Sequence, residues 1–124
     1  MSRPERILLP PLLIAVIIII FSSIPALKGP DLGVSFQDKI YHFIEYAVFG
    51  WFLTRAGYSL IRKTWAAPLI PFLAGMLFAL SDEWHQSMVP GREGNLDDVM
   101  ADGAGLLFAA LLYSCWRLKK FKIE

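Results

Sequence analysis

The sequence predicts an all-α integral membrane bundle of four transmembrane helices, and three observations lead to this fold class. Of the 124 residues, 56% are hydrophobic and only 19% are charged. A water-soluble domain of this length would struggle to bury so much apolar surface, so a bilayer is the simpler solvent. The chain also contains four apolar stretches, each near the roughly 20 residues that a spanning helix needs. Third, most lysines and arginines lie near the two termini and the middle connection, as the orientation of a membrane protein would require. We expect one domain, residues 1–124.

The first apolar stretch is expected to form a helix over about residues 7–27. Arg3 and Arg6 precede it, as basic residues would precede the apolar region of a cleaved signal peptide. However, this apolar region is longer than that of a typical signal, and no clean small-x-small cleavage site follows. We therefore expect a retained helix. Pro10 and Pro11 are expected in its first turn or two, where a missing N–H costs least.

Three further helices are expected over about 39–60, 65–89 and 96–116. The last stretch is plainly apolar, whereas ionisable residues interrupt the other two. Loop-forming residues separate the helices: a Gly-Pro pair follows the first, Arg62 and Lys63 mark a short second connection, and a Pro-Gly turn follows the third.

The positions of lysine and arginine predict the orientation of the helices. With four spans, the two termini and the middle connection share one face, which carries nine of the twelve basic residues. Basic residues are retained on the cytoplasmic side, so both termini are expected to be cytoplasmic. The opposite face carries nine of the eleven acidic residues and both histidines, but only Lys28, Lys39 and Arg92 as bases. Such an acidic outer half would attract a cation or a positively charged ligand.

Composition also limits the partners. The net charge is +1 and the bases form no stripe with aromatic residues, so nucleic acid is not an expected partner. The single cysteine, Cys115, cannot form a disulfide within the chain, and its apolar setting indicates a packing role. The lipid bilayer is the expected partner. A homo-oligomer stays open, and a transport pathway would require one because four helices are few.

The polar residues of the last three predicted helices share helix faces. Asp38, His42 and Glu45 follow i, i+4, i+7 spacing and therefore lie on one side of their helix. The faces of the third and fourth helices continue toward the cytoplasm with glycine and alanine, which let backbones approach closely in lipid, so we expect the three faces to meet. The resulting candidate pocket residues are Asp38, Lys39, His42, Glu45, Asp82, Glu83, Gln86, Arg92, Asp98 and Asp102.

These residues predict a polar pocket that opens to the outer surface beneath the loop 89–95. An ionisable side chain that faces lipid costs several kcal/mol, so such residues turn inward and find partners. Crowded carboxylates cannot all stay ionised without help. They could share protons, pair with the nearby bases, or hold a divalent metal, for which His42, Glu45 and Asp82 are the candidates. No H-x-x-x-H or H-E-x-x-H spacing supports a zinc site.

Structural roles stay open for several pocket residues. Asp38 and Asp98 begin predicted helices, and the positive N-terminal end of a helix favours acidic residues there. Lys39 and Arg92 could instead extend toward lipid headgroups. For the deeper carboxylates, the cost of charge inside a membrane favours a functional role.

The ordered set of motifs resembles the VanZ-like family of small bacterial membrane proteins, related to the teicoplanin-resistance protein. The resemblance rests on Asp38-Lys39-Ile40-Tyr41-His42-Phe43 with Tyr46 and Gly50, then Ser81-Asp82-Glu83-Trp84-His85-Gln86, Pro90-Gly91-Arg92, and finally Asp98, Ala101 and Gly105. One position departs from the family pattern, because Asn is expected where this chain has Asp102. The difference adds an acid to the predicted pocket.

The resemblance implies a role in the bacterial cell envelope, with the protein in the cytoplasmic (inner) membrane. It supplies no reaction, and three hypotheses follow. The first is a binding or protective protein whose outer pocket engages a cationic group, a lipid-linked cell-wall precursor or a glycopeptide-related ligand, with a link to teicoplanin resistance. The second is an intramembrane metal-assisted hydrolase or transferase acting on a lipid-linked substrate. The third is a small proton-linked transporter or flippase. No cofactor other than a divalent metal is indicated.

Overall fold

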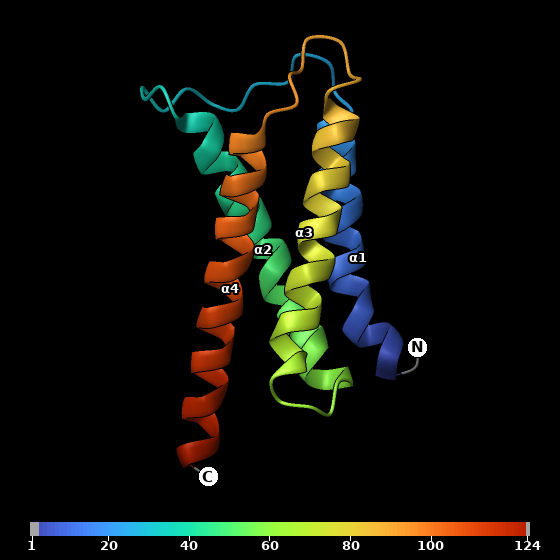
Figure 1. The fold of residues 1–124 in the computed structure, drawn as a ribbon, viewed down its shortest axis with the longest axis vertical. Coiled ribbons are helices and arrows are strands. Elements are labelled where there is room, and N and C mark those ends of the chain that lie inside the picture. The colour runs from blue at the N-terminus through green and yellow to red at the C-terminus, as the bar shows by residue number, and fades with distance from the viewer. Residues whose placement is uncertain (1–2, 124) are drawn as a thin grey trace.

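The computed structural model describes residues 3–123, which form four α-helices. These are α1 (Arg3–Ser22), α2 (Gln37–Leu60), α3 (Ala66–Gln86) and α4 (Leu96–Ile123). The helices alternate in direction, so both chain ends and the short α2–α3 connection lie at one end of the bundle (Figure 1). We call this the terminal end, and we call the other end, with connections 23–36 and 87–95, the loop end. The predicted all-α architecture of four helices is confirmed.

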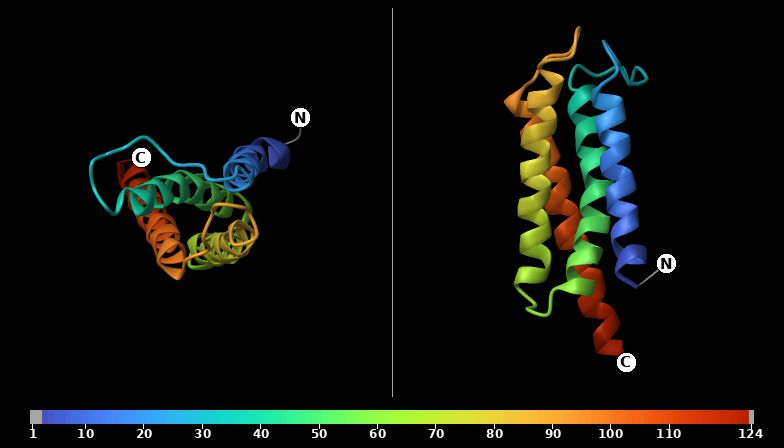
Figure 2. Two further views of the ribbon diagram at one scale, coloured as in Figure 1. Left: turned by 90° about the horizontal axis from the view of Figure 1, so that it is seen from above. Right: turned by 90° about the vertical axis from the view of Figure 1, so that its right-hand side faces the viewer.

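Among the four helices of residues 3–123, three are long and apolar enough to cross a membrane: α1, α3 and the Leu96–Lys120 part of α4. Helix α2 has 24 residues, but Lys39, Glu45 and Arg55 and other polar residues interrupt its apolar sequence. It packs against each of the other three helices, as the view from above shows (Figure 2). Its neighbours therefore shield part of its polar surface.

Helix α1 lies at the edge of the bundle. It packs against α2 and α3, and within residues 3–123 it does not contact α4. Its buried residues are Pro11, Ile18 and Ser22, whereas most of its leucines and isoleucines are exposed. The bundle centre is formed mainly by the other three helices (Figure 2), and α1 contributes Ile18 to the core.

The close approach of α2 and α4 depends on small residues. A Cβ added at Gly50 would lie 3.1 Å from the Ala109 Cβ. A Cβ added at Gly105 would collide with the Phe43 carbonyl and lie 2.9 Å from the Ala47 nitrogen. Small residues allow this spacing between helix backbones in a membrane. Of the three helix faces expected to meet, those of α2 and α4 are therefore in close contact.

The helix ends differ from the predicted ones by a few residues. Helix α1 ends at Ser22 rather than at residue 27, because Pro25 disfavours helical backbone in the residue before it and Ala26 has a φ of 50°. Helix α3 ends at Gln86 rather than at residue 89. Helix α4 continues to Ile123, beyond the predicted residue 116, since its basic tail contains no glycine or proline to stop it.

The two adjacent prolines of α1 lie deeper in the helix than predicted. The helix begins at Arg3, which places Pro10 and Pro11 in its interior rather than in its first two turns. The first residues, interpreted from sequence as a charged flank, are themselves helical. Because proline has no N–H, the carbonyls of Arg6 and Ile7 lose their usual intrahelical donors.

Candidate functional site

Six of the ten predicted pocket residues are buried near the loop end, where α2, α3 and α4 converge. They are His42, Asp82, Glu83, Gln86, Asp98 and Asp102, and each is at most 7% exposed. The other four surround them: Asp38 is exposed, whereas Lys39, Glu45 and Arg92 are half-buried. The helix-face spacing therefore places charged groups inside the bundle instead of on its outer surface.

His42 joins α2 to α4 through two aspartates. Its Nδ1 lies 2.9 Å from the Asp102 Oδ1, and its Nε2 lies 3.9 Å from the Asp98 Oδ2. Lys39 donates to Asp98, and its Nζ is also 3.9 Å from the Asp38 Oδ2. Basic groups of one helix thus alternate with acidic groups along the contact with the other.

A second network is centred on α3. The Tyr46 hydroxyl donates to the Asp82 Oδ2 over 3.2 Å, and the Gln86 Nε2 donates to the same oxygen over 3.3 Å. Gln86 also donates to the Ser22 Oγ over 3.1 Å and accepts from the Arg92 Nη2 over 2.8 Å. These bonds connect α1, α2 and α3 to the loop that follows α3.

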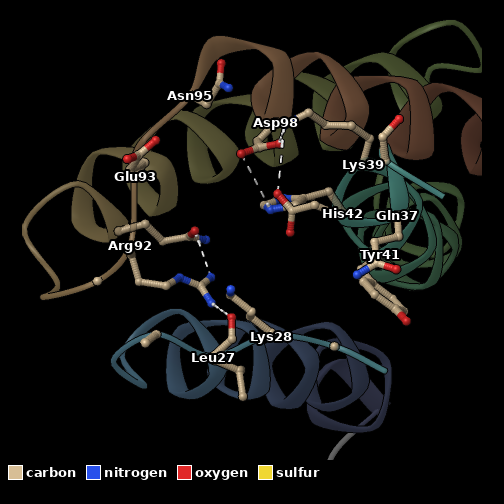
Figure 3. A pocket seen from close by; sticks show the side chains of 16 residues that line it. Leu27, Lys28, Gln37, Lys39, Tyr41, His42, Arg92, Glu93, Asn95 and Asp98 are labelled. Atoms are coloured by element: carbon tan, nitrogen blue, oxygen red, sulfur yellow. Dashed lines mark hydrogen bonds and ion pairs between the residues drawn. The ribbon is translucent and has the colours of Figure 1, made fainter. Parts of the chain in front are cut away.

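The connections at the loop end are fixed to each other and to the bundle. The Arg92 Nη1 donates to the Leu27 carbonyl over 3.1 Å, which ties loop 87–95 to loop 23–36 (Figure 3). The Asn95 N–H donates to the Glu83 Oε1 over 2.8 Å. Both loops, rather than the second loop alone, therefore cover the polar residues.

Two adjoining cavities open among these groups. The first, which we call the loop cavity, has a volume of about 430 Å³ and is lined by residues that include Lys28, Lys39, His42, Arg92 and Asp98. The side chains of Lys28 and Arg92 extend from different loops toward the same part of it (Figure 3). The second, the lateral cavity, has a volume of about 450 Å³, shares part of this lining and adds Phe21, Ile44 and Glu45.

In the part of the chain that the structure describes, three buried carboxylate oxygens have no hydrogen-bond partner: the Asp82 Oδ1, the Glu83 Oε2 and the Asp102 Oδ2. Burial of such an oxygen without a partner is costly. Two groups of side chains also have ligand atoms within 4.8 Å of one another, namely Asp38 with His42 and Asp98, and His42 with Glu83 and Asp102. Within residues 3–123, the metal candidates Glu45 and Asp82 belong to neither group.

Sequence reasoning did not identify Tyr46 and Ser22 as parts of the site. Tyr46 is fully buried and lies four residues after His42, a spacing that places both on one helix face. That spacing is compatible with a place in the site, but it does not distinguish Tyr46 from Glu45. Glu45, the preceding residue, lies instead at the lateral cavity. No local pattern reveals Ser22, because its contact with Gln86 joins residues 64 positions apart.

Comparison with protein families gives a match over residues 7–117, to the VanZ/LLP1 family. Comparisons with curated proteins and with solved structures give no significant match. The family match covers most of the chain, so this protein belongs to the VanZ/LLP1 family, and the resemblance noted from its ordered motifs is confirmed. Together with three membrane-capable helices, this membership identifies a membrane protein.

Proposed function

We propose that this member of the VanZ/LLP1 family is a four-span protein of the bacterial inner membrane whose loop cavity binds a ligand of the cell envelope. Helix α2 would be the fourth span, because it has sufficient length and its Lys39, His42 and Tyr46 side chains contact α4 or α3. The bias of basic residues toward the terminal end favours cytoplasmic termini and an outward-facing loop end. The loop cavity would then open on the outer side of the membrane.

The observation that carries this proposal is the pair of basic side chains that extend into the loop cavity. Arg92 is bound by two uncharged acceptors, Gln86 and the Leu27 carbonyl. Within residues 3–123, neither Arg92 nor Lys28 forms an ion pair with a carboxylate. A guanidinium group and an ammonium group side by side favour an anionic partner such as a phosphate.

The lateral cavity extends this binding surface toward apolar side chains. Phe21 and Ile44 form part of its wall, and both are about half exposed on the bundle surface, at 49% and 53%. An amphiphile could therefore place its anionic headgroup between Arg92 and Lys28 and its chain along this wall. We infer that the ligand is a lipid-linked cell-wall precursor with a phosphate group. Holding such a precursor would change its access to a glycopeptide, which links the cavity to teicoplanin resistance.

The proposal is tested in a glycopeptide-sensitive bacterium by the inhibitory concentration of teicoplanin. The strains carry an empty vector, the wild type, Arg92→Gln, Lys28→Gln, or the control Lys63→Gln, which changes an exposed lysine at the terminal end. Immunoblots of membranes establish equal protein levels. We expect the wild type and Lys63→Gln to protect, and the two cavity variants to lose protection.

Two results would contradict the proposal. If Arg92→Gln and Lys28→Gln protect as well as the wild type, the loop cavity is not the binding site. If the wild type gives the same inhibitory concentration as the empty vector, the link to teicoplanin resistance is rejected. A direct binding experiment then tests whether the loop cavity binds the ligand. It compares the retention of a fluorescent polyprenyl phosphate by the purified wild type and by Arg92→Gln.

A metal-assisted hydrolase or transferase is the second candidate function. The clustering of His42 with acidic side chains beside the loop cavity favours it, because a bound ion could activate water next to a substrate phosphate. Its test is release of phosphate from a polyprenyl diphosphate by purified protein with added Mn²⁺ or Zn²⁺. Transport is less well supported, since the core below the polar networks consists of apolar residues that include Phe49 and Leu106.

A further inference from the structure

The described part of the bundle buries more acidic than basic groups. Asp82, Glu83, Asp98 and Asp102 are each at most 5% exposed. The ammonium group near them, on Lys39, pairs with Asp98. Negative charge that is buried without a partner is strongly destabilising. This cluster therefore requires bound protons or a bound cation.

The position of a cation follows from the groups that already have partners. Two clusters share His42. The outer one contains Asp98, to which the Lys39 ammonium already supplies a positive charge. The inner one joins His42 to Glu83 and Asp102, all buried, and includes two oxygens without a hydrogen-bond partner, the Glu83 Oε2 and the Asp102 Oδ2. Even a protonated His42, which contacts Asp102, balances only one of the two carboxylates, so the inner cluster is the one that lacks sufficient counter-charge.

We propose that His42, Glu83 and Asp102 bind one divalent cation next to the loop cavity, of which His42 is a lining residue. Their ligand atoms lie within 4.8 Å of one another. Metal–ligand bonds of about 2.0–2.3 Å place two ligand atoms of one ion no more than about 4.6 Å apart, so small side-chain shifts suffice. An imidazole combined with carboxylates suits Mn²⁺ or Zn²⁺ better than Mg²⁺ or Ca²⁺, which prefer oxygen alone.

The surrounding hydrogen bonds hold the proposed ligands in place. The Asn95 N–H binds the Glu83 Oε1 and leaves the other oxygen of that carboxylate available. The His42 Nδ1 already lies 2.9 Å from the Asp102 Oδ1. The Asn95 bond is a contact from outside the ligand set, of the kind that orients metal ligands. Because the three ligands come from α2, α3 and α4, the ion would join these helices whatever envelope ligand the cavity takes. This inference therefore goes beyond the proposed binding role and does not depend on it.

The test measures metal content and metal-dependent stability, and it requires no activity. The full chain, carrying a purification tag without histidine, is purified in detergent without chelator, and its metals are quantified by mass spectrometry. A second sample is stripped with EDTA and dialysed, and its Tm is measured with Mn²⁺, Zn²⁺, Mg²⁺ or Ca²⁺. We expect about one Mn²⁺ or Zn²⁺ per chain and a rise in Tm of roughly 5–10 °C when that ion is restored.

Matched variants locate the ion. Glu83→Gln and Asp102→Asn should each lose the bound metal and the Tm rise, whereas Asp97→Asn, which changes an exposed acid in the first turn of α4, should keep both. A wild type without metal and without a Tm rise would overturn the proposal, and so would a full rise in both cluster variants. If these variants do not fold, a measurement on the metal-free wild type replaces them. Added Co²⁺ should give visible absorption bands that Zn²⁺ abolishes. Absence of the bands would overturn the proposal.

Discussion

The two ends of the α2–α4 pair are held together by different chemistry. At the terminal end the contact is aromatic: the rings of Trp51 and Tyr113 lie 4.9 Å apart between centroids. The polar groups there have partners, since the Tyr58 hydroxyl donates to the Ser114 Oγ over 3.0 Å. The basic residue Arg117 lies over the Tyr58 ring, 4.8 Å from its centroid. This end is accounted for by packing.

At the loop end the same two helices meet through charged groups. His42 lies between Asp98 and Asp102, and buried carboxylate oxygens are left without partners. Apolar or aromatic side chains would join the helices at lower cost, because buried charges lose their hydration. Packing explains the contact at the terminal end, whereas the buried charges at the loop end favour the proposed binding role.

The largest expected effect is that of His42→Ala. It removes the partner that joins Asp98 and Asp102 to α2, so we expect a loss of about 3–5 kcal/mol in the free energy of unfolding. The control is His85→Ala, because His85 is half-buried and lies 3.0 Å from the Oγ of the exposed Ser23. Denaturant unfolding in detergent, followed by circular dichroism, measures both. Equal losses for the two variants would contradict the central place given to His42.

The same substitution at each end compares the two directly. Tyr46→Phe removes a donor to the buried Asp82 carboxylate, so we expect a loss of about 1.5–3 kcal/mol. Tyr58→Phe removes a bond to the hydroxyl of Ser114, which keeps its own bond to the Ala110 carbonyl, so about 0.5–1.5 kcal/mol should be lost. Denaturant unfolding of both variants under the same conditions gives the ratio of the two losses in free energy of unfolding. A larger loss for Tyr58→Phe would break the comparison.

Gly105→Ala is expected to lower the free energy of unfolding by about as much as Tyr46→Phe, or by less. This variant tests whether the close approach of the two helix backbones positions the polar groups. The added Cβ would meet the backbone of Phe43 and Ala47, and overpacking of this kind costs about 1–3 kcal/mol. The control Gly103→Ala meets only the flexible side chain of Met76, at 3.0 Å, so its helix propensity should leave stability unchanged or raised. The Tm in detergent distinguishes them. A Tm for Gly105→Ala at or above that of Gly103→Ala would contradict this packing.

Local sequence patterns predict most of the fold. The apolar stretches give the four helices, and helical spacing places Asp82 with Gln86, and Asp98 with Asp102, on the faces that the structure buries. Spacing is less informative on α2, where polar and aromatic residues occur on several sides. The sequence pattern there favours Glu45 as a pocket residue, whereas Tyr46 is the fully buried one.

The contacts between loops could not be predicted in this way. The bond from Arg92 to the Leu27 carbonyl joins residues 65 positions apart, and it depends on how α1 and α3 end. The grouping of His42 with Glu83 and Asp102 likewise depends on the rotation of three helices about their axes. Periodicity identifies the face of each helix, but the distances between side chains come only from packing.

The most direct test of the central claim asks on which side of the membrane the loop end lies. In a Cys115→Ser background, single cysteines are introduced by Glu93→Cys in the exposed loop before α4 and by Lys63→Cys at the terminal end. Intact cells are treated with a membrane-impermeant maleimide, with and without permeabilisation. We predict that Glu93→Cys is labelled in intact cells and that Lys63→Cys is labelled only after permeabilisation. The reverse pattern would place the cavity in the cytoplasm and contradict an outward-facing binding site.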